Sequence, residues 1–292
     1  MEQLINLRDL TLVERQHARQ GVFHFYSLVQ GKSGTPGSFY MQLGRTYSDF
    51  FSPRHRHNFE QVRLQLEGTV SFGRDGVMSP GTVGYFPEGV YYGPQTLEDE
   101  SYTLVLQFGG ASGSGYMSDA VFQAAMNEMK AAGTFEGGVY KVPKPGGGSR
   151  NRDAYEAVWE HVNGRRLRYP KPRYDKPLFM ESASFEWQPG GMPGLERKHL
   201  GTFTECRTEI DLLRIQAGHT VPVDADAVLF VLSGAGTADG KGWEKHSAMY
   251  SGTRPGALTV LQTAEVLKVV LPKVAHLAHR AQAPAAAEMA LA

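Results

Sequence analysis

Short apolar runs bounded by Gly, Pro, Ser or Asp recur along the first part of the chain. Runs of this kind, rich in Val, Leu, Phe and Tyr, are typical of strands joined by tight turns. A spacing of about ten residues between strands favours an all-β sandwich or barrel. We therefore expect strands at residues 22–30, 39–44, 61–67, 70–73, 83–86 and 102–108.

The pattern changes to a helical period in the middle of the chain. One helix is expected to begin after Ser118, a favourable N-cap residue, and to end by Gly133. A second is expected over residues 152–163, with Gly164 as its terminator. Residues 141–150 are rich in Pro and Gly and are expected to be a linker between the helices.

Strand-like runs return after this helical segment, at residues 202–205, 209–216, 228–232, 257–262 and 265–271. The pattern predicts an N-terminal β domain (1–110), a helical and irregular connector (111–177) and a C-terminal β domain (178–274). The last residues, 275–292, are rich in Ala and are expected to be a disordered tail.

Composition narrows the class of protein. The 292 residues are 41% apolar, which is ample for a large core, and 30 basic residues balance 30 acidic ones. This balance argues against a nucleic-acid partner, and no apolar run approaches the ~20 residues of a membrane helix. The single cysteine, Cys206, permits no internal disulfide, which is compatible with a cytoplasmic protein.

The stretch His55-Arg56-His57-Asn58-Phe59-Glu60-Gln61 is the most informative for chemistry. Residues two apart face the same side of a strand, so His55, His57 and Gln61 share one face. Two imidazoles on one wall of a barrel can bind Zn, Cu, Fe, Ni or Mn.

These residues resemble the motifs of the cupin superfamily. The first motif is His-x-His, three or four residues, Glu, six residues, Gly; the chain has His55, His57, Gln61 and Gly68 at these positions. The second is Gly, five residues, Pro-x-Gly, two residues, His; the chain has Gly81, Pro87, Gly89 and Tyr92. Gln61 and Tyr92 thus replace the usual Glu and His.

The resemblance implies a divalent metal, Fe(II) first and Zn, Mn, Ni or Cu otherwise, held by His55, His57 and Gln61. Tyr92 could add a ligand only as a phenolate, which requires a pKa below its usual value of about 10. The alternative is a pocket without metal, in which the two histidines hydrogen-bond a ligand or the barrel rim.

Arg63 and Gln65 follow Gln61 on the same strand face and are expected to point into the barrel. Arg63 needs either an internal carboxylate or an anionic substrate as its partner. Tyr85, Tyr91 and Gln107 are further candidates for the pocket, although aromatic strand residues are usually core.

The opposite face of this strand carries Val62, Leu64 and Leu66. These apolar side chains must be covered by another sheet. The second barrel of the same chain and the partner subunit of a homodimer both fit this requirement.

The C-terminal β domain repeats the strand that leads to the motif glycine, with Gly234 in the place of Gly68. The positions of the three predicted ligands are taken there by Val221, Val223 and Ala227. The chain therefore resembles a bicupin, with two jelly-roll barrels and a metal site only in the first.

Three functions remain open. The first is a metal-dependent oxidoreductase, a dioxygenase for a small aromatic or dicarbonyl acid, with Arg63 and Tyr92 as catalytic residues. The second is an isomerase, lyase or cyclase that uses His57 or Tyr92 as acid and base. The third is a non-catalytic protein that binds a small anion.

Overall fold

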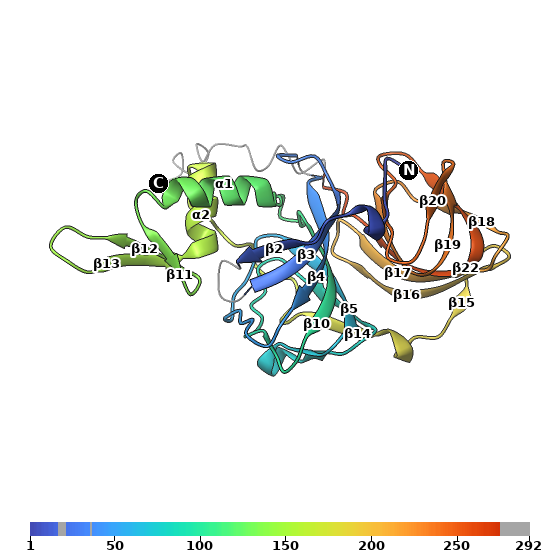
Figure 1. The fold of residues 1–292 in the computed structure, drawn as a ribbon, viewed down its shortest axis with the longest axis horizontal. Coiled ribbons are helices and arrows are strands. Elements are labelled where there is room, and N and C mark those ends of the chain that lie inside the picture. The colour runs from blue at the N-terminus through green and yellow to red at the C-terminus, as the bar shows by residue number, and fades with distance from the viewer. Residues whose placement is uncertain (17–21, 36, 275–292) are drawn as a thin grey trace, which may run out of the picture.

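The computed structural model describes residues 1–16, 22–35 and 37–274. Strands of these residues form two barrels that lie side by side, and the two helices lie at the end of the first barrel (Figure 1). The all-β prediction with a short helical connector is confirmed. The predicted disordered tail, 275–292, lies outside the described residues.

The first barrel is an antiparallel sheet of seven strands closed by a small sheet of three. The order in the large sheet is β14 (Leu178–Glu181), β8 (Thr82–Phe86), β5 (Glu60–Glu67), β10 (Ser101–Phe108), β4 (Phe39–Thr46), β3 (Val22–Gln30) and β2 (Val13–Gln16). The small sheet contains β7 (Val77–Met78), β6 (Val70–Ser71) and β9 (Thr96–Leu97).

The second barrel is a nine-stranded sheet. Its main order is β1 (Gln3–Ile5), β21 (Ala248–Tyr250), β19 (Ala227–Ala238), β22 (Gly256–Val270), β17 (Thr208–Ile215), β16 (Leu195–Phe203) and β15 (Gln188–Pro189). β18 (Thr220–Val223) pairs with β22, and β20 (Lys241–Trp243) pairs with β19. The two strands expected at 257–262 and 265–271 are one continuous strand, β22.

The two barrels exchange strands. The N-terminal strand β1 pairs with β21 of the second barrel, and β14 pairs with β8 of the first. The boundaries predicted at residues 110 and 178 therefore do not describe these two strands. Each strand crosses to the neighbouring barrel, and the two crossings tie the barrels together.

The connector contains α1 (Asp119–Met129) and α2 (Ala154–Asn163), close to the predicted helices. The Ser118 side chain caps α1 by accepting a hydrogen bond from the Val121 amide, and Gly164 ends α2 in a left-handed conformation. The expected linker at 141–150 is instead part of a small sheet of β11 (Thr134–Glu136), β12 (Val139–Pro143) and β13 (Ser149–Asp153). Its Gly-rich tip forms the turn of a β12–β13 hairpin, which explains the composition.

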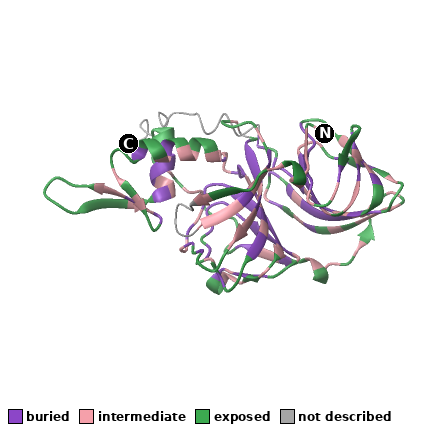
Figure 2. Cartoon of the chain, in the orientation of Figure 1, coloured by how far each residue is buried: buried purple, intermediate pink, exposed green. Residues whose placement is uncertain are grey.

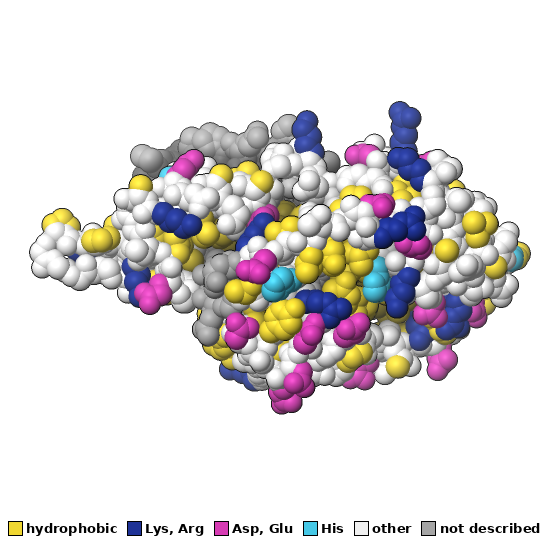
Figure 3. Space-filling model, viewed as in Figure 1, with side chains coloured by type: hydrophobic (Ala, Val, Ile, Leu, Met, Phe, Trp, Pro, Cys, Tyr) yellow, Lys and Arg dark blue, Asp and Glu magenta, His cyan; other side chains and the backbone are white. Residues whose placement is uncertain are grey.

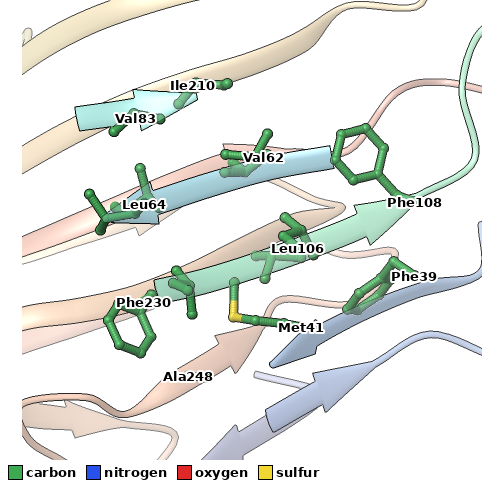
Figure 4. Packing of buried hydrophobic residues seen from close by; sticks show 14 of the residues in the cluster. Phe39, Met41, Val62, Leu64, Val83, Leu106, Phe108, Ile210, Phe230 and Ala248 are labelled. Atoms are coloured by element: carbon green, nitrogen blue, oxygen red, sulfur yellow. The ribbon is translucent and has the colours of Figure 1, made fainter. Parts of the chain in front are cut away.

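The apolar outer faces of the barrels pack against each other. Val62 and Leu64 of β5 lie in one buried cluster with Ile210 of β17 and Phe230 of β19 (Figure 4). Leu66 is half-buried and packs against the same cluster. Figure 2 shows buried residues gathered on the strands where the barrels meet. The second barrel of the chain therefore covers the apolar outer face of β5, which the sequence predicted to be covered by another sheet.

The motif glycine has the same role in both barrels. Gly68 and Gly234 have φ angles of 71° and 87°, and a Cβ at Gly68 would meet the Glu100 carbonyl oxygen at 2.1 Å. The interior of the second barrel differs from that of the first. Val221 and Val223 are buried there in an apolar cluster with Ala227, so this interior is a packed core.

The surface carries mixed charge. On the face seen in Figure 3, Lys and Arg side chains are interspersed with Asp and Glu. Within the described part of the chain, neither helix has the length and apolar character to cross a membrane.

Candidate functional site

A cavity of about 240 Å³ occupies the first barrel. Paired residues of the neighbouring strands β5 and β10 form part of its wall. Gln61 lies opposite Gln107, Arg63 opposite Val105, and Gln65 opposite Thr103. The predicted pocket residues Gln65 and Gln107 therefore line the cavity. Its size is slightly below the ~300 Å³ lower end for ligand pockets, which favours a small ligand.

The connector helices line one end of this cavity. Asp119 and Phe122 of α1 and Tyr155 of α2 all contribute to its wall. Arg15 of β2 forms an ion pair with Asp119 and thereby joins the barrel edge to α1. Tyr155 donates a hydrogen bond to the Asn58 side chain at 2.7 Å. The helices are thus part of the site and not only a connection between barrels.

The Tyr92 hydroxyl lies at the centre of the residues that match the cupin motifs. It is 3.0 Å from His55 Nε2 and 3.2 Å from His57 Nδ1. Arg63 Nη2 donates to it at 3.1 Å, and Gln61 Oε1 lies 3.4 Å away. Strand β5 and the bridge between residues 55 and 92 bring these positions together.

The Pro53 carbonyl group determines which atoms of this cluster carry protons. His55 Nδ1 is 2.6 Å from the Pro53 carbonyl oxygen, which can only accept, so this nitrogen carries a proton. In a neutral His55 the other nitrogen, Nε2, then accepts the Tyr92 hydroxyl proton. His57 Nδ1 must in turn donate to the Tyr92 oxygen, which makes His57 Nε2 the proton-accepting atom of that ring.

The His57 ring is held from its other side by aromatic residues. It stacks on Phe59 with ring centroids 4.4 Å apart, and the Tyr155 ring lies edge-on at 5.7 Å. His57 lines the cavity, so a ligand there can meet an imidazole whose orientation and tautomer are fixed.

Arg63 is buried in the cavity wall, where it donates to neutral side chains and lies against aromatic rings. Its Nε and Nη2 donate to Gln61 Oε1 at 3.1 and 2.7 Å, and its Nη1 donates to Gln95 Oε1 at 2.9 Å. The guanidinium carbon lies 4.4 Å from the centroid of the Phe86 ring. Because a guanidinium only donates, both amide oxygens must face it and both amide NH₂ groups must point away.

These residues do not fit a resident divalent metal. No group of three or more His, Cys, Asp and Glu side chains suited to a metal occurs in residues 1–16, 22–35 and 37–274. Gln61 presents its oxygen to Arg63. A dication bound to this oxygen would lie about 4 Å from the guanidinium. The repulsion between the two positive charges would be about 8 kcal/mol at an effective dielectric constant of 20.

Three predicted site residues lie elsewhere. Tyr85 is on the outer face of β8, because alternation turns it toward the second barrel, where it stacks on Phe203 at 4.2 Å. Tyr91 is 48% exposed, under Arg56. Tyr92 is buried behind the wall and outside the set of cavity-lining residues, so we assign it a positioning role and not a catalytic one.

Several residues of the wall were not predicted, among them Gln42, Gln95 and Tyr155. Gln42 lies on β4 opposite Val105, and the strand alternation carries a signal for it. Gln95 and Tyr155 come from a loop and a connector helix. No motif spacing relates these two to β5, so only the tertiary fold reveals them.

A buried carboxyl pair lies behind the site wall. Glu60 follows Phe59 on the outer face of β5, is fully buried, and accepts a hydrogen bond from Thr208 of the second barrel. Burial, with the nearby Glu88 carboxylate, raises the Glu60 pKa from 4.5 to about 8. Burial also raises the Glu88 pKa, although Ser112 and Arg173 hold its carboxylate.

Comparison with known proteins shows which class of fold the chain has. No protein-family model matches the chain, and no curated protein sequence matches it. Solved structures do match it. One is a provisionally assigned dioxygenase from Nostoc punctiforme, with a TM-score of 0.59 and 10% identity over 94% of this chain and 83% of that chain.

Two further matches have ligands in their descriptions. HEPD from Streptomyces albus, with 2-hydroxyethylphosphonate and Fe(II) bound, has a TM-score of 0.54 and 11% identity over 98% of this chain and 80% of that one. An oxalate decarboxylase–formate complex from Lactobacillus farciminis has a TM-score of 0.52 and 8% identity over 92% and 86%.

These neighbours are cupin-fold proteins, and the chain has the cupin fold in a two-barrel, bicupin arrangement. The fold predicted from the motifs is confirmed. At about 10% identity the likeness extends to the fold alone, because one fold supports many chemistries. The chemistry must be argued from the residues in the first barrel.

Proposed function

We propose that this protein is an enzyme that binds a small organic acid in the first barrel and moves a proton on it. Arg63 holds the anionic group, and His57 is the general base and acid. The observation that carries this proposal is the Tyr92 hydroxyl, within hydrogen-bond distance of both imidazoles and of Arg63 at a cavity wall.

The reaction uses the proton arrangement described above. His57 Nε2 takes a proton from a carbon or hydroxyl next to the acid group, and the same atom returns it at a second position. The Tyr92 oxygen accepts from His57 Nδ1 throughout and stabilises the imidazolium, while His55 holds the Tyr92 proton. Such a transfer belongs to isomerases, lyases and cyclases, the second of the three functions left open by the sequence.

Deuterium exchange on a panel of candidate acids tests this proposal. Several 2-hydroxy, 2-oxo and aromatic carboxylic acids are incubated with the protein in D₂O and followed by ¹H NMR. We expect loss of a C–H signal in at least one acid, and at least a 100-fold slower loss with His57→Gln. The matched control is His219→Gln, at a half-buried position of the second barrel, outside the cavity.

The metal-dependent dioxygenase remains a prediction from the resemblance, supported by the Fe(II) in one fold neighbour. It requires Arg63 to leave Gln61 and Tyr92. Oxygen consumption that depends on added Fe(II) and on both His55 and His57 would overturn the acid–base proposal. Binding of an acid with no exchange in any member of the panel would instead support the non-catalytic anion-binding function.

A further inference from the structure

We propose that the Arg63 guanidinium takes the place of a metal ion in this barrel, and that Gln61 and Gln95 complete a site for a deprotonated carboxylate. The inference rests on the proposed function in one respect, the position of the acid group. Its tests measure binding and metal content, so they can fail while proton exchange by His57 is still observed.

The first argument is the position of the charge. The resemblance assigns metal-ligand positions to residues 55, 57, 61 and 92, and the structure brings the first three within hydrogen-bond distance of the Tyr92 hydroxyl. Arg63 contacts two of the four directly, Gln61 and Tyr92. A permanent positive charge therefore lies among the side chains that would otherwise surround a cation.

The second argument explains why position 61 is an amide. A glutamate there would place a carboxylate oxygen at the present distances of 2.7 and 3.1 Å from two Arg63 nitrogens, and this ion pair would neutralise the guanidinium. Gln61 positions Arg63 without cancelling its charge. The amide at position 61 and the inward Arg63 therefore act together.

The third argument concerns the chemical class of the ligand. Arg63 fixes the amides of Gln61 and Gln95 with their oxygens toward the guanidinium, so their NH₂ groups are the donors left for other partners. An array of donors suits a group that only accepts, such as a carboxylate. A neutral amide or a protonated acid would place its own donor against this array, and that donor would lose its hydrogen bond to water without gaining an acceptor.

Two probes of equal shape separate these ligand classes. Binding of benzoate and of benzamide is measured by NMR chemical-shift titration of the purified protein at pH 7.5. We expect benzoate to bind at least 10-fold more tightly than benzamide, a preference that Gln61→Glu and Arg63→Leu both abolish. Equal affinities, or a benzoate preference unchanged in both variants, would overturn the inference.

The metal content of the protein tests whether Arg63 takes the place of a metal ion. Wild type, Arg63→Leu and the double variant Gln61→Glu/Arg63→Leu are loaded with Fe(II), Mn(II) or Ni(II), desalted, and assayed by mass spectrometry. We expect less than about 0.1 metal per wild-type chain and about one per double-variant chain, since the latter offers two histidines and a carboxylate. Adding His55→Ala should remove that metal again.

Two results would contradict this account. One equivalent of metal on the wild type, lost on His55→Ala, would show that Arg63 does not take the place of the ion. A double variant that takes up no metal would show that Gln61 and Arg63 are not what excludes it. Far-UV circular dichroism confirms that each variant is folded, and Arg63→Leu alone gives the benzoate result if the double variant is not.

Discussion

Glu60→Gln is expected to stabilise the protein above neutral pH. Glu60 is fully buried between the barrels and accepts a hydrogen bond from Thr208 at 3.3 Å. Gln has the shape of the protonated acid, keeps an oxygen for Thr208, and cannot ionise. The substitution therefore removes a buried charge while preserving the packing.

The magnitude follows from the Glu60 pKa, which is about 8 in the folded protein and 4.5 in the reference state. A raised folded pKa means that stability is highest below pH 4.5 and falls as pH rises to about 8. At 1.36 kcal/mol per pKa unit, the complete loss is about 4 to 5 kcal/mol. Between pH 5.5 and 8.5, wild type should lose about 3 kcal/mol relative to Glu60→Gln.

Urea unfolding followed by tryptophan fluorescence at pH 5.5, 7.0 and 8.5 measures this difference. The control is Glu98→Gln, which removes an exposed carboxyl group and should change the free energy of unfolding by less than about 0.5 kcal/mol. If Glu60→Gln is less stable than wild type at pH 8.5, the Glu60 carboxylate is needed in its ionised form and the argument is wrong.

Three other substitutions test separate parts of the account. Tyr92→Phe should lower the proton-exchange rate about 10-fold or more and shift its pH profile, since His57 loses the acceptor at Nδ1; an unchanged profile would remove Tyr92 from the site. Phe230→Ala should destabilise the packing between the barrels by about 3–5 kcal/mol in urea unfolding; a change below about 1 kcal/mol would contradict the shared core. Gly68→Ala should lower the melting temperature, because φ is 71° and the Glu100 carbonyl oxygen blocks a Cβ, whereas Gly146→Ala in the open hairpin tip should change it less.

Much of the fold could be predicted because it depends on local patterns. Strand alternation placed Val62 and Leu64 on one face and Arg63 on the other, and both assignments hold. The spacing of Gly68 and Gly234 identified the same turn in each barrel, where positive φ requires glycine. The apolar residues at positions 221, 223 and 227 predicted a second barrel without metal ligands, and the structure buries all three in a packed core.

The strand exchange could not be predicted in this way. β1 has three residues and β14 has four, too few for a period to be recognised. Their place is decided by pairing with β21 and β8, which are far away in sequence. The same holds for the β12–β13 hairpin, whose glycine-rich turn reads as a linker when the pairing strands are unknown.

The sequence predicted the positions of some cavity-lining residues but not their contacts. His55, His57 and Gln61 all line the cavity, but only Gln61 lies on strand β5; the two histidines precede it, where the bridge between residues 55 and 92 holds the chain. That Arg63 would donate to Gln61 and Gln95, and that the Glu60 carboxyl would meet Thr208, depends on distances across loops and barrels. Side chains from a connector helix, such as Tyr155, have no spacing relation to the motif.

The tautomer of His57 tests the central claim most directly. A long-range ¹H–¹⁵N correlation spectrum of the neutral histidine side chains at pH 8, assigned with His57→Gln, reports which ring nitrogen carries the proton. The account predicts a proton on Nδ1 of both His55 and His57, which leaves His57 Nε2 as the proton-accepting atom. A neutral His57 with its proton on Nε2 would contradict the proposed base and the proton arrangement around Tyr92.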